Sequence, residues 1–183
     1  MKADIMDATD LPSGVTASYA NGTLTVKGPK GEVAKRLKDP KLQMEASGSK
    51  VVIKCKNASR KEKRMANTFG AHLKNMVEGV QKPYRYQLKV CSGHFPMNVA
   101  IQGEQLVVKN FLGEKFPRTL KIKKGATVKV EGEKITIESC DKELAGKIAS
   151  DIELLTAKSN RDLRVFQDGI YMIEKANEVL GVQ

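Results

Sequence analysis

The chain carries nearly the same nine residues twice. LTVKGPKGE runs from Leu24 to Glu32, and LVVKNFLGE runs from Leu106 to Glu114. At the same spacing Arg36 matches Arg118. Each copy follows a glycine-containing tight turn, in YANGTL and in IQGEQL, which predicts a β-hairpin in both places. KVVIKC and the later KITIES extend the match. The chain is therefore expected to hold two copies of one small domain.

Helical spacing follows each set of predicted strands. Ser59 and Glu62 have the spacing of a capping box, and Asp141 is expected to cap a second helix. The two apolar stripes recur every three or four residues, as the core-facing side of a helix does. The first stripe is Met65, Phe69, Leu73, Met76, Val77 and Val80, and the second is Leu144, Ile148, Ile152 and Leu155.

The strands alternate between apolar and charged residues. In TLKIKK, Leu120 and Ile122 are expected to point inward and Lys121 and Lys123 outward. We therefore predict an α+β fold of two tandem duplicated domains, each a small antiparallel sheet packed with one helix. The segment from Tyr84 to Val90 also alternates like a strand, and we interpret it as closing the first sheet.

Proline and glycine place the joint between the copies. Pro83, Gly93 and Pro96 interrupt the chain between the first helix and the second set of strands. The predicted bounds are residues 1–10 for an N-terminal tail, 11–82 for the first repeat, 83–175 for the second repeat and 176–183 for a C-terminal tail.

The charge of the chain indicates its partners. Its 183 residues include 32 Lys and Arg against 21 Asp and Glu, a formal charge of +11. Such a charge favours polyanions, nucleic acid first and acidic membrane surfaces second. Three widely spaced cysteines fit a reducing compartment better than a disulfide framework. Because the first residues resemble no signal peptide and no long apolar run occurs, we expect a cytoplasmic protein without a membrane partner.

Catalytic and metal-binding motifs are weak. His72 and His94 are the two histidines, and His94 forms a Cys-x-x-His pair with Cys91. Such a pair supplies two ligands where a metal site needs three or four. Neither a P-loop nor a dinucleotide-binding glycine pattern occurs. We therefore expect no enzyme activity, no metal, no cofactor and no small-molecule substrate.

Three basic clusters are candidates for binding phosphates. SRKEKR places Arg60, Lys61 and Arg64 at a helix start, where cations oppose the helix dipole; a nearby phosphate backbone or a solvated charged face would each explain them. The other clusters lie in VKNFLGEKFPRTLKIKKG and KSNRDLRVFQDGIYMIEK. Their candidate residues are Lys109, Lys115, Arg118, Lys121 and Lys123 in the first segment, and Lys158, Arg161 and Arg164 in the second.

Two phenylalanines interrupt the basic segment before Lys121. An aromatic residue at a loop tip can stack on an unpaired base. Phe116 lies between predicted strands, so we favour an inward, packed position for it. Gln167, Asp168 and Gly169 are expected to form a turn.

The distribution of these cations favours folded RNA. A membrane-binding segment would concentrate its charge on one amphipathic helix with bulky aromatics, and the chain has no Trp. A folded RNA presents phosphates in many directions, which suits lysines spread over strands and loops.

The doubled unit, its LTVKGPKGE and LVVKNFLGEK segments, TFGAHLKNMVEGV and NRDLRVFQDGIY together resemble the large-subunit ribosomal protein L-six family, in its archaeal and eukaryotic form. The resemblance implies a non-catalytic constituent of the large ribosomal subunit. It implies binding to large-subunit rRNA near the factor-binding region and the sarcin-ricin loop, with neighbouring ribosomal proteins as further partners. It adds Asn110 and Tyr171 to the candidate RNA ligands, and it places the RNA-binding tip in the second repeat. The bacterial Pro-Tyr-Lys-Gly-Lys-Gly segment is missing, so its lysines have no counterpart here.

Two alternatives remain open at the level of sequence. One is an enzyme on an anionic substrate with His72 or His94 as base, and the other is a basic protein-interaction module.

Overall fold

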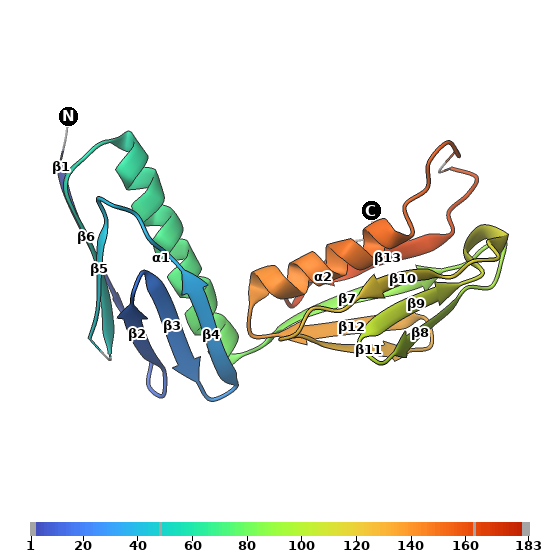
Figure 1. The fold of residues 1–183 in the computed structure, drawn as a ribbon, viewed down its shortest axis with the longest axis horizontal. Coiled ribbons are helices and arrows are strands. Elements are labelled where there is room, and N and C mark those ends of the chain that lie inside the picture. Colours follow the sequence, from blue (N-terminus) through green and yellow to red (C-terminus); the bar gives the residue numbers. More distant parts are fainter. Residues whose placement is uncertain (1–2, 48, 163, 181–183) are drawn as a thin grey trace. The chain divides into compact units, whose positions relative to one another are not determined.

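The computed structural model describes residues 3–47, 49–162 and 164–180 of the chain (Figure 1). The chain divides into two compact units between Pro83 and Tyr84. Each unit combines antiparallel strands with one long helix, so the predicted α+β class is confirmed. No helix among the described residues is long and apolar enough to cross a membrane.

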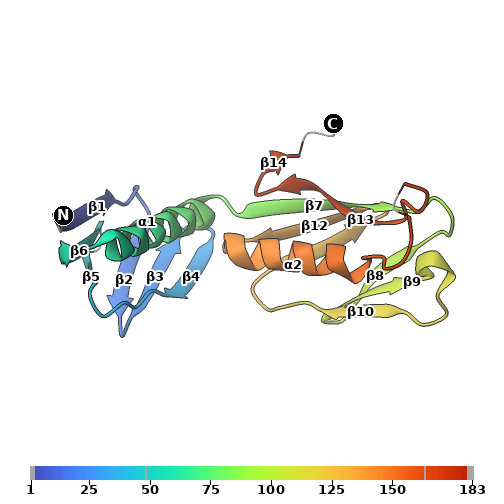
Figure 2. The same cartoon turned by 90° about the horizontal axis from the view of Figure 1, so that it is seen from above.

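Unit 1 has two three-stranded sheets covered by one helix. The sheet orders are β1-β6-β5 and β2-β3-β4, and helix α1 packs against strands of both. Figure 2 shows α1 lying across these strands. Its elements are β1 Ala3–Asp10, β2 Thr16–Ala20, β3 Thr23–Gly28, β4 Gly31–Arg36, β5 Gln43–Ser47, β6 Lys50–Ala58 and α1 Arg60–Gln81.

Local sequence explains the hairpins and the helix start in unit 1. Asn21 and Gly22 both have positive φ, 52° and 81°, which is the conformation that a two-residue hairpin turn requires. The predicted capping box is present, because the Ser59 side chain accepts from the first turn and Glu62 accepts from the Ser59 backbone N–H.

Unit 2 has a five-stranded and a three-stranded sheet. The orders are β11-β12-β7-β13-β14 and β10-β9-β8, and helix α2 packs on β7, β12, β13 and β10. Asp141 caps α2 as predicted. The elements are β7 Tyr84–Cys91, β8 Asn98–Gln102, β9 Gln105–Lys109, the short 3₁₀ turn η1 Phe111–Gly113, β10 Arg118–Lys121, β11 Thr127–Glu131, β12 Lys134–Ser139, α2 Lys142–Leu155, β13 Gly169–Lys175 and β14 Glu178–Val179.

The two units repeat one topology. In unit 1, β6 lies between β1 and β5, and in unit 2, β12 lies between β7 and β11. The other sheets, β2-β3-β4 and β10-β9-β8, match in the same way. The repeated apolar positions are core positions in both units, since Leu24, Leu106 and Ile137 are fully buried and Ile53 is 1% exposed. The repetition in the sequence therefore encodes the two cores.

Three expectations about segments are corrected by the strand pairing. The segment from Tyr84 to Val90 does not close the first sheet, because β7 pairs with β12 and β13 at the centre of the five-stranded sheet. The segment expected as an N-terminal tail contains β1, which pairs with β6 along most of its length. The segment expected as a C-terminal tail contains β14, which pairs with β13.

The strand register also corrects one match of the repeat. In unit 1, Val26 pairs with Val33, whereas its counterpart Val108 pairs with Arg118. Arg118 therefore corresponds to Val33 and not to Arg36, and the second copy holds three more residues between equivalent positions. These extra residues turn a tight hairpin end into a longer loop, residues 110–117, between β9 and β10.

Candidate nucleic-acid interface

Three loops meet at one end of unit 2. They are residues 92–97 between β7 and β8, residues 110–117 between β9 and β10, and residues 156–168 between α2 and β13. The antiparallel pairing brings these loops together. Strand β7 ends where its neighbour β13 begins, and β9 ends where its neighbour β10 begins. Figures 1 and 2 show the connections at the same end of the unit. We call this end the tip of unit 2.

Asp168 joins two of these loops. Its side chain is fully buried, and it accepts hydrogen bonds from the backbone N–H groups of Gly93, His94 and Phe95. The His94 ring Nδ1 lies 3.1 Å from the same carboxylate. Burial alone would raise the pKa of Asp168, but these hydrogen bonds outweigh it and lower the pKa from 3.8 to about 2. Asp168 is therefore a buried carboxylate whose hydrogen-bond donors come from the β7–β8 loop. It does not lie in the turn that the sequence had suggested.

Lys158 holds the α2–β13 loop closed from inside. Its Nζ donates to the carbonyl oxygens of Phe166, at 2.6 Å, and of Asp168. It also donates to the Tyr171 hydroxyl at 3.0 Å, and that hydroxyl donates to the Gln167 carbonyl. The donors of Lys158 and Tyr171, both predicted RNA ligands, are thus engaged within the chain.

Arg118 is engaged in the same way. Its guanidinium makes two hydrogen bonds to the Glu114 carboxylate and donates to the Leu155 carbonyl at the end of α2. The guanidinium carbon lies 4.3 Å from the centre of the Phe111 ring. The hydrogen bond from Arg118 lowers the pKa of Glu114. Arg118 therefore fastens the β9–β10 loop to α2.

The arginines of the α2–β13 loop are more exposed. Arg161 lies 4.8 Å over the Phe166 ring, which in turn stacks on His94 at 5.0 Å. Arg164 is 90% exposed and pairs with Asp162, which lowers the pKa of that carboxyl. Leu163, between them, lies outside the described residues.

The lysines of β9, β10 and the loop between them are the least engaged cations of this hairpin. Lys109 and Lys115 lie at the tip, whereas Lys121 lies at the other end of β10, where it pairs with Gln105. Lys109, Lys115 and Lys121 are exposed, and none lies within ion-pair distance of an acidic group in the described part of the chain. Lys123 approaches Asp151 at 3.8 Å. Asn110 has φ 59° and donates to the Pro96 carbonyl, so it shapes the loop beside these lysines. The inward positions of Leu120 and Ile122 are confirmed, since both pack on the core.

The two phenylalanines of the loop have opposite roles. Phe111 is 1% exposed and belongs to the core. Phe116 is 85% exposed, so the expected inward position is wrong. The three extra residues of the second copy carry Phe116 beyond the sheet, where no core position remains for it. The loop therefore presents one anchored and one free aromatic ring.

A small hollow lies between two of the loops. Its volume is about 160 Å³, and its lining includes Arg118, Lys158 and Arg161 with Glu114 as the acidic member. The donors of Lys158 and three N–H groups of Arg118 are already bonded within the chain, so the hollow is a basic but internally bonded part of the tip.

The basic cluster of unit 1 stands apart from this arrangement. Arg60, Lys61 and Arg64 are exposed in the first turns of α1. Glu62 does not neutralise them, because its carboxylate accepts from Ser59 and from Lys41 at 3.0 Å. The hydrogen bonds from Ser59 and then Lys41 lower the pKa of Glu62 from 4.5 to about 2. The cluster is therefore exposed and keeps its positive charge.

Each of the two histidines lies within hydrogen-bond distance of a side chain of its own unit. His72 Nδ1 lies 3.0 Å from Lys35 Nζ, and His94 faces Asp168. Among the described residues no group of three or more His, Cys, Asp or Glu is placed to hold a metal ion.

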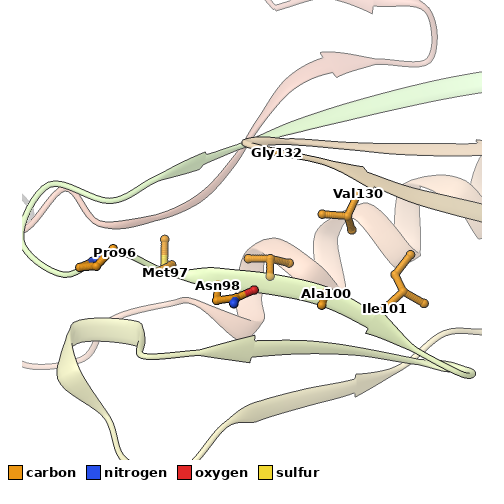
Figure 3. A pocket seen from close by; sticks show the side chains of 8 residues that line it. Pro96, Met97, Asn98, Ala100, Ile101, Val130 and Gly132 are labelled. Atoms are coloured by element: carbon orange, nitrogen blue, oxygen red, sulfur yellow. The ribbon is translucent and has the colours of Figure 1, made fainter.

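A separate groove of about 800 Å³ lies between β8 and β11. Figure 3 shows its lining, with Met97, Ala100 and Ile101 on one side and Val130 on the other. The residues that line it include no titratable side chain, so they supply no acid, base or nucleophile.

Sequence reasoning missed the residues that organise the tip. Asp168, His94 and Phe166 hold the loops, and exposed Phe95 lies beside Gly113. No local pattern singles out Asp168, because Asp162 and Glu174 are acidic residues of the same segment.

Comparison with known proteins gives one consistent result. The model of the family described as Ribosomal protein L6 matches residues 11–83 and 95–169. A large ribosomal subunit protein uL6 of Nanoarchaeum equitans is 44% identical, covering 92% of both chains. The uL6 proteins of Methanococcus vannielii and Methanosarcina mazei are 36% and 38% identical, covering 96% of this chain and 97% and 100% of theirs. The family consists of structural proteins and not of enzymes, as the sequence led us to expect. The chain therefore belongs to the ribosomal protein L6 family.

Proposed function

We propose that this protein is a structural constituent of the large ribosomal subunit in the cytoplasm and binds large-subunit rRNA through the tip of unit 2. The observation that carries the proposal is the arrangement of the tip. Lys109 and Lys115 at the tip, and Lys121 at the other end of β10, are exposed on a hairpin whose loop is held in place by hydrogen bonds from Asn110 and Arg118. Because the loop is already ordered, these lysines can bind phosphates without a further loss of conformational entropy in the loop.

The candidate ligands separate into two groups by what they already contact. Lys109, Lys115, Lys121 and exposed Phe116 face solvent, and we propose that they contact RNA directly. Arg118, Lys158 and Tyr171 act as positioning residues, because their donors are used within the chain. Arg161 and Arg164 lie between these groups, since both are exposed but Arg161 contacts the Phe166 ring and Arg164 pairs with Asp162.

The place of binding within the subunit follows from the family resemblance. We propose the rRNA near the factor-binding region and the sarcin-ricin loop, with a role in subunit assembly and in supporting translation. Neighbouring ribosomal proteins are the further partners. Unit 1 then contributes phosphate contacts through Arg60, Lys61 and Arg64 or faces such neighbours.

A charge-reversal experiment on the full chain tests the proposal. A variant with Lys109, Lys115 and Lys121 changed to Glu should bind large-subunit rRNA more weakly, and the dependence of its log affinity on log salt should flatten by about one unit per lost phosphate contact. The matched control changes Lys129, Lys147 and Lys175, exposed lysines of β11, α2 and β13. Equal losses in the two variants would mean that net charge and not the tip determines binding.

A further inference from the structure

Strand β1 leaves one edge of unit 1 open. It pairs with β6 on one side and is the last strand of its sheet in the described chain. Alternate backbone N–H and C=O groups of such a strand point away from the sheet and are available to another strand.

The second copy of the fold shows what occupies this edge when it is filled. Strand β7 corresponds to β1, and β13 pairs with β7 on the side away from β12. Figure 2 shows β13 along β7, whereas β1 has no such neighbour among the described strands. Strand β13 also packs against α2 and places Ile170 in the core. The duplicated fold therefore accepts an antiparallel strand at this position.

The side chains of β1 and β7 differ because β13 lies beside β7 and no described strand lies on the corresponding side of β1. In unit 1, Ile53 pairs with Asp7, and in unit 2 its counterpart Ile137 pairs with Tyr86. Asp7 therefore occupies the position that the buried Tyr86 has in unit 2. Thr9 occupies the position of Leu88 in the same way, through Val51 and Ile135. Unit 1 thus has polar and acidic residues where unit 2 has core residues. Its open edge suits a polar occupant.

A groove follows the open edge. It has a volume of about 480 Å³ and lies between β1 and α1. Its charged lining residues are Asp7, Asp10, Glu78 and Lys74, three acids against one base. Gly70 in α1 leaves room beside Asp7, whose carboxylate oxygen lies 3.5 Å from a Cβ built at that glycine. Within a chain of formal charge +11, β1 has three Asp and no Lys or Arg.

We propose that the free edge of β1 docks an extended, basic segment of a partner protein. The segment pairs antiparallel with β1, as β13 pairs with β7, and its alternate Lys or Arg side chains enter the groove toward Asp7 and Glu78. Asp10, which pairs with Lys50 at 3.1 Å, adds negative charge at the end of the groove. The same carboxylates repel phosphates, so this edge selects protein over RNA. The site is independent of the RNA-binding tip in unit 2.

The test uses the full chain and a labelled nonapeptide that alternates Val and Lys, with a Val–Glu peptide for comparison. Fluorescence anisotropy should show that the lysine peptide binds and that the glutamate peptide does not. Hydrogen exchange should slow in β1 on binding. A lysine peptide N-methylated at alternate backbone nitrogens cannot pair as a strand and should not bind.

A charge variant links binding to this edge. Changing Asp7 and Asp10 to Lys should weaken binding of the lysine peptide about tenfold or more, and the milder Asp7→Asn, Asp10→Asn variant should weaken it less. The matched control, Glu131→Lys with Glu133→Lys in unit 2, should leave it unchanged. The proposal is overturned if the two peptides bind alike, if the N-methylated peptide binds, if protection appears on another strand, or if the Asp7 and Asp10 variants bind normally.

Discussion

A single buried residue, Asp168, holds together two of the loops that form the tip of unit 2. Asp168 has no exposed surface, and backbone groups of three consecutive residues donate to it. A buried acceptor with several donors is expensive to remove, because every donor then loses its partner without gaining water.

Changing Asp168 to Ala should lower the free energy of unfolding of unit 2 by about 2–4 kcal/mol, since the N–H groups of Gly93, His94 and Phe95 lose their acceptor. Urea titration followed by circular dichroism measures this. The control is Asp162→Ala, which removes an exposed carboxylate and should change stability by less than about 0.5 kcal/mol. Similar effects of the two changes would contradict the buried role of Asp168.

The two phenylalanines of the β9–β10 loop should separate stability from binding. Phe111→Ala should cost about 3–5 kcal/mol of stability, because this ring lies in the core. Phe116→Ala should leave stability within about 0.5 kcal/mol of the parent. The Phe116 change should nevertheless weaken rRNA binding by about 1–3 kcal/mol if the ring stacks on a base. Thermal melting and filter binding measure the two quantities, and unchanged RNA affinity would remove Phe116 from the interface.

The pH dependence of unit 1 should follow Glu62. Its pKa is about 2 in the folded chain and 4.5 ordinarily, so the unfolded chain takes up the proton first as pH falls. The stabilisation from Glu62 is therefore complete above about pH 4.5 and is lost as pH falls from there toward 2. Glu62→Gln should flatten the pH profile of stability across this window. Because Asp168 titrates in a similar range, the measured quantity is the difference between variant and parent; parallel profiles would refute the assignment.

At the scale of elements, glycines decide how helix α1 meets its strands. Gly28 ends β3 where the β3–β4 hairpin touches the end of α1, and the Lys30 N–H donates to the Val80 carbonyl. A Cβ at Gly28 would lie 2.7 Å from a methyl carbon of Val80. Gly70, within α1, would meet Asp7 only at an ordinary contact distance of 3.5 Å.

These two glycines should respond to alanine with opposite signs. Gly28→Ala should destabilise unit 1 by about 1–3 kcal/mol, because the hairpin and helix must move apart. Gly70→Ala should stabilise it by about 0.5–1 kcal/mol, since alanine favours the helix interior. Thermal unfolding of the full chain distinguishes them, and a neutral Gly28→Ala variant would show that the hairpin end adapts freely.

At the scale of the whole molecule, the two copies share a scaffold and differ in what is added to it. Unit 2 gained three residues in its β9–β10 loop and carries β13 and β14 beyond β7. Unit 1 keeps a tight hairpin and an open β1 edge. In unit 2, the longer β9–β10 loop and the connection to β13 form part of the tip. Unit 1 has no described strand in the position of β13, so the edge of β1 stays open.

Charge reversal in the two units should therefore have unequal consequences for rRNA binding. Arg60, Lys61 and Arg64 changed to Glu should reduce affinity less than the same change at Lys109, Lys115 and Lys121, because the unit 1 cluster lacks the supporting loops of the tip. Co-sedimentation with large subunits across a salt series measures both. A larger loss from the unit 1 variant would move the principal contact to α1.

The sequence by itself determined the duplication, the fold class, the helix caps and the inward faces of the strands. These features depend on local patterns: Asn21–Gly22 requires a hairpin turn, Ser59 and Glu62 cap a helix, and apolar spacing selects the buried face. The family resemblance came from similar contiguous segments.

Only the tertiary structure decided which strand β7 joins, how far the register shifts at Arg118, and which cations remain free. Lys115 and Lys158 look alike in the sequence, yet Lys158 is bonded to carbonyl groups of its own loop while Lys115 faces solvent. Phe111 and Phe116 separate in the same way. Partners that are distant in the chain make these distinctions, because a hydrogen bond between residues such as Gly93 and Asp168 depends on how the loops meet and not on any local pattern.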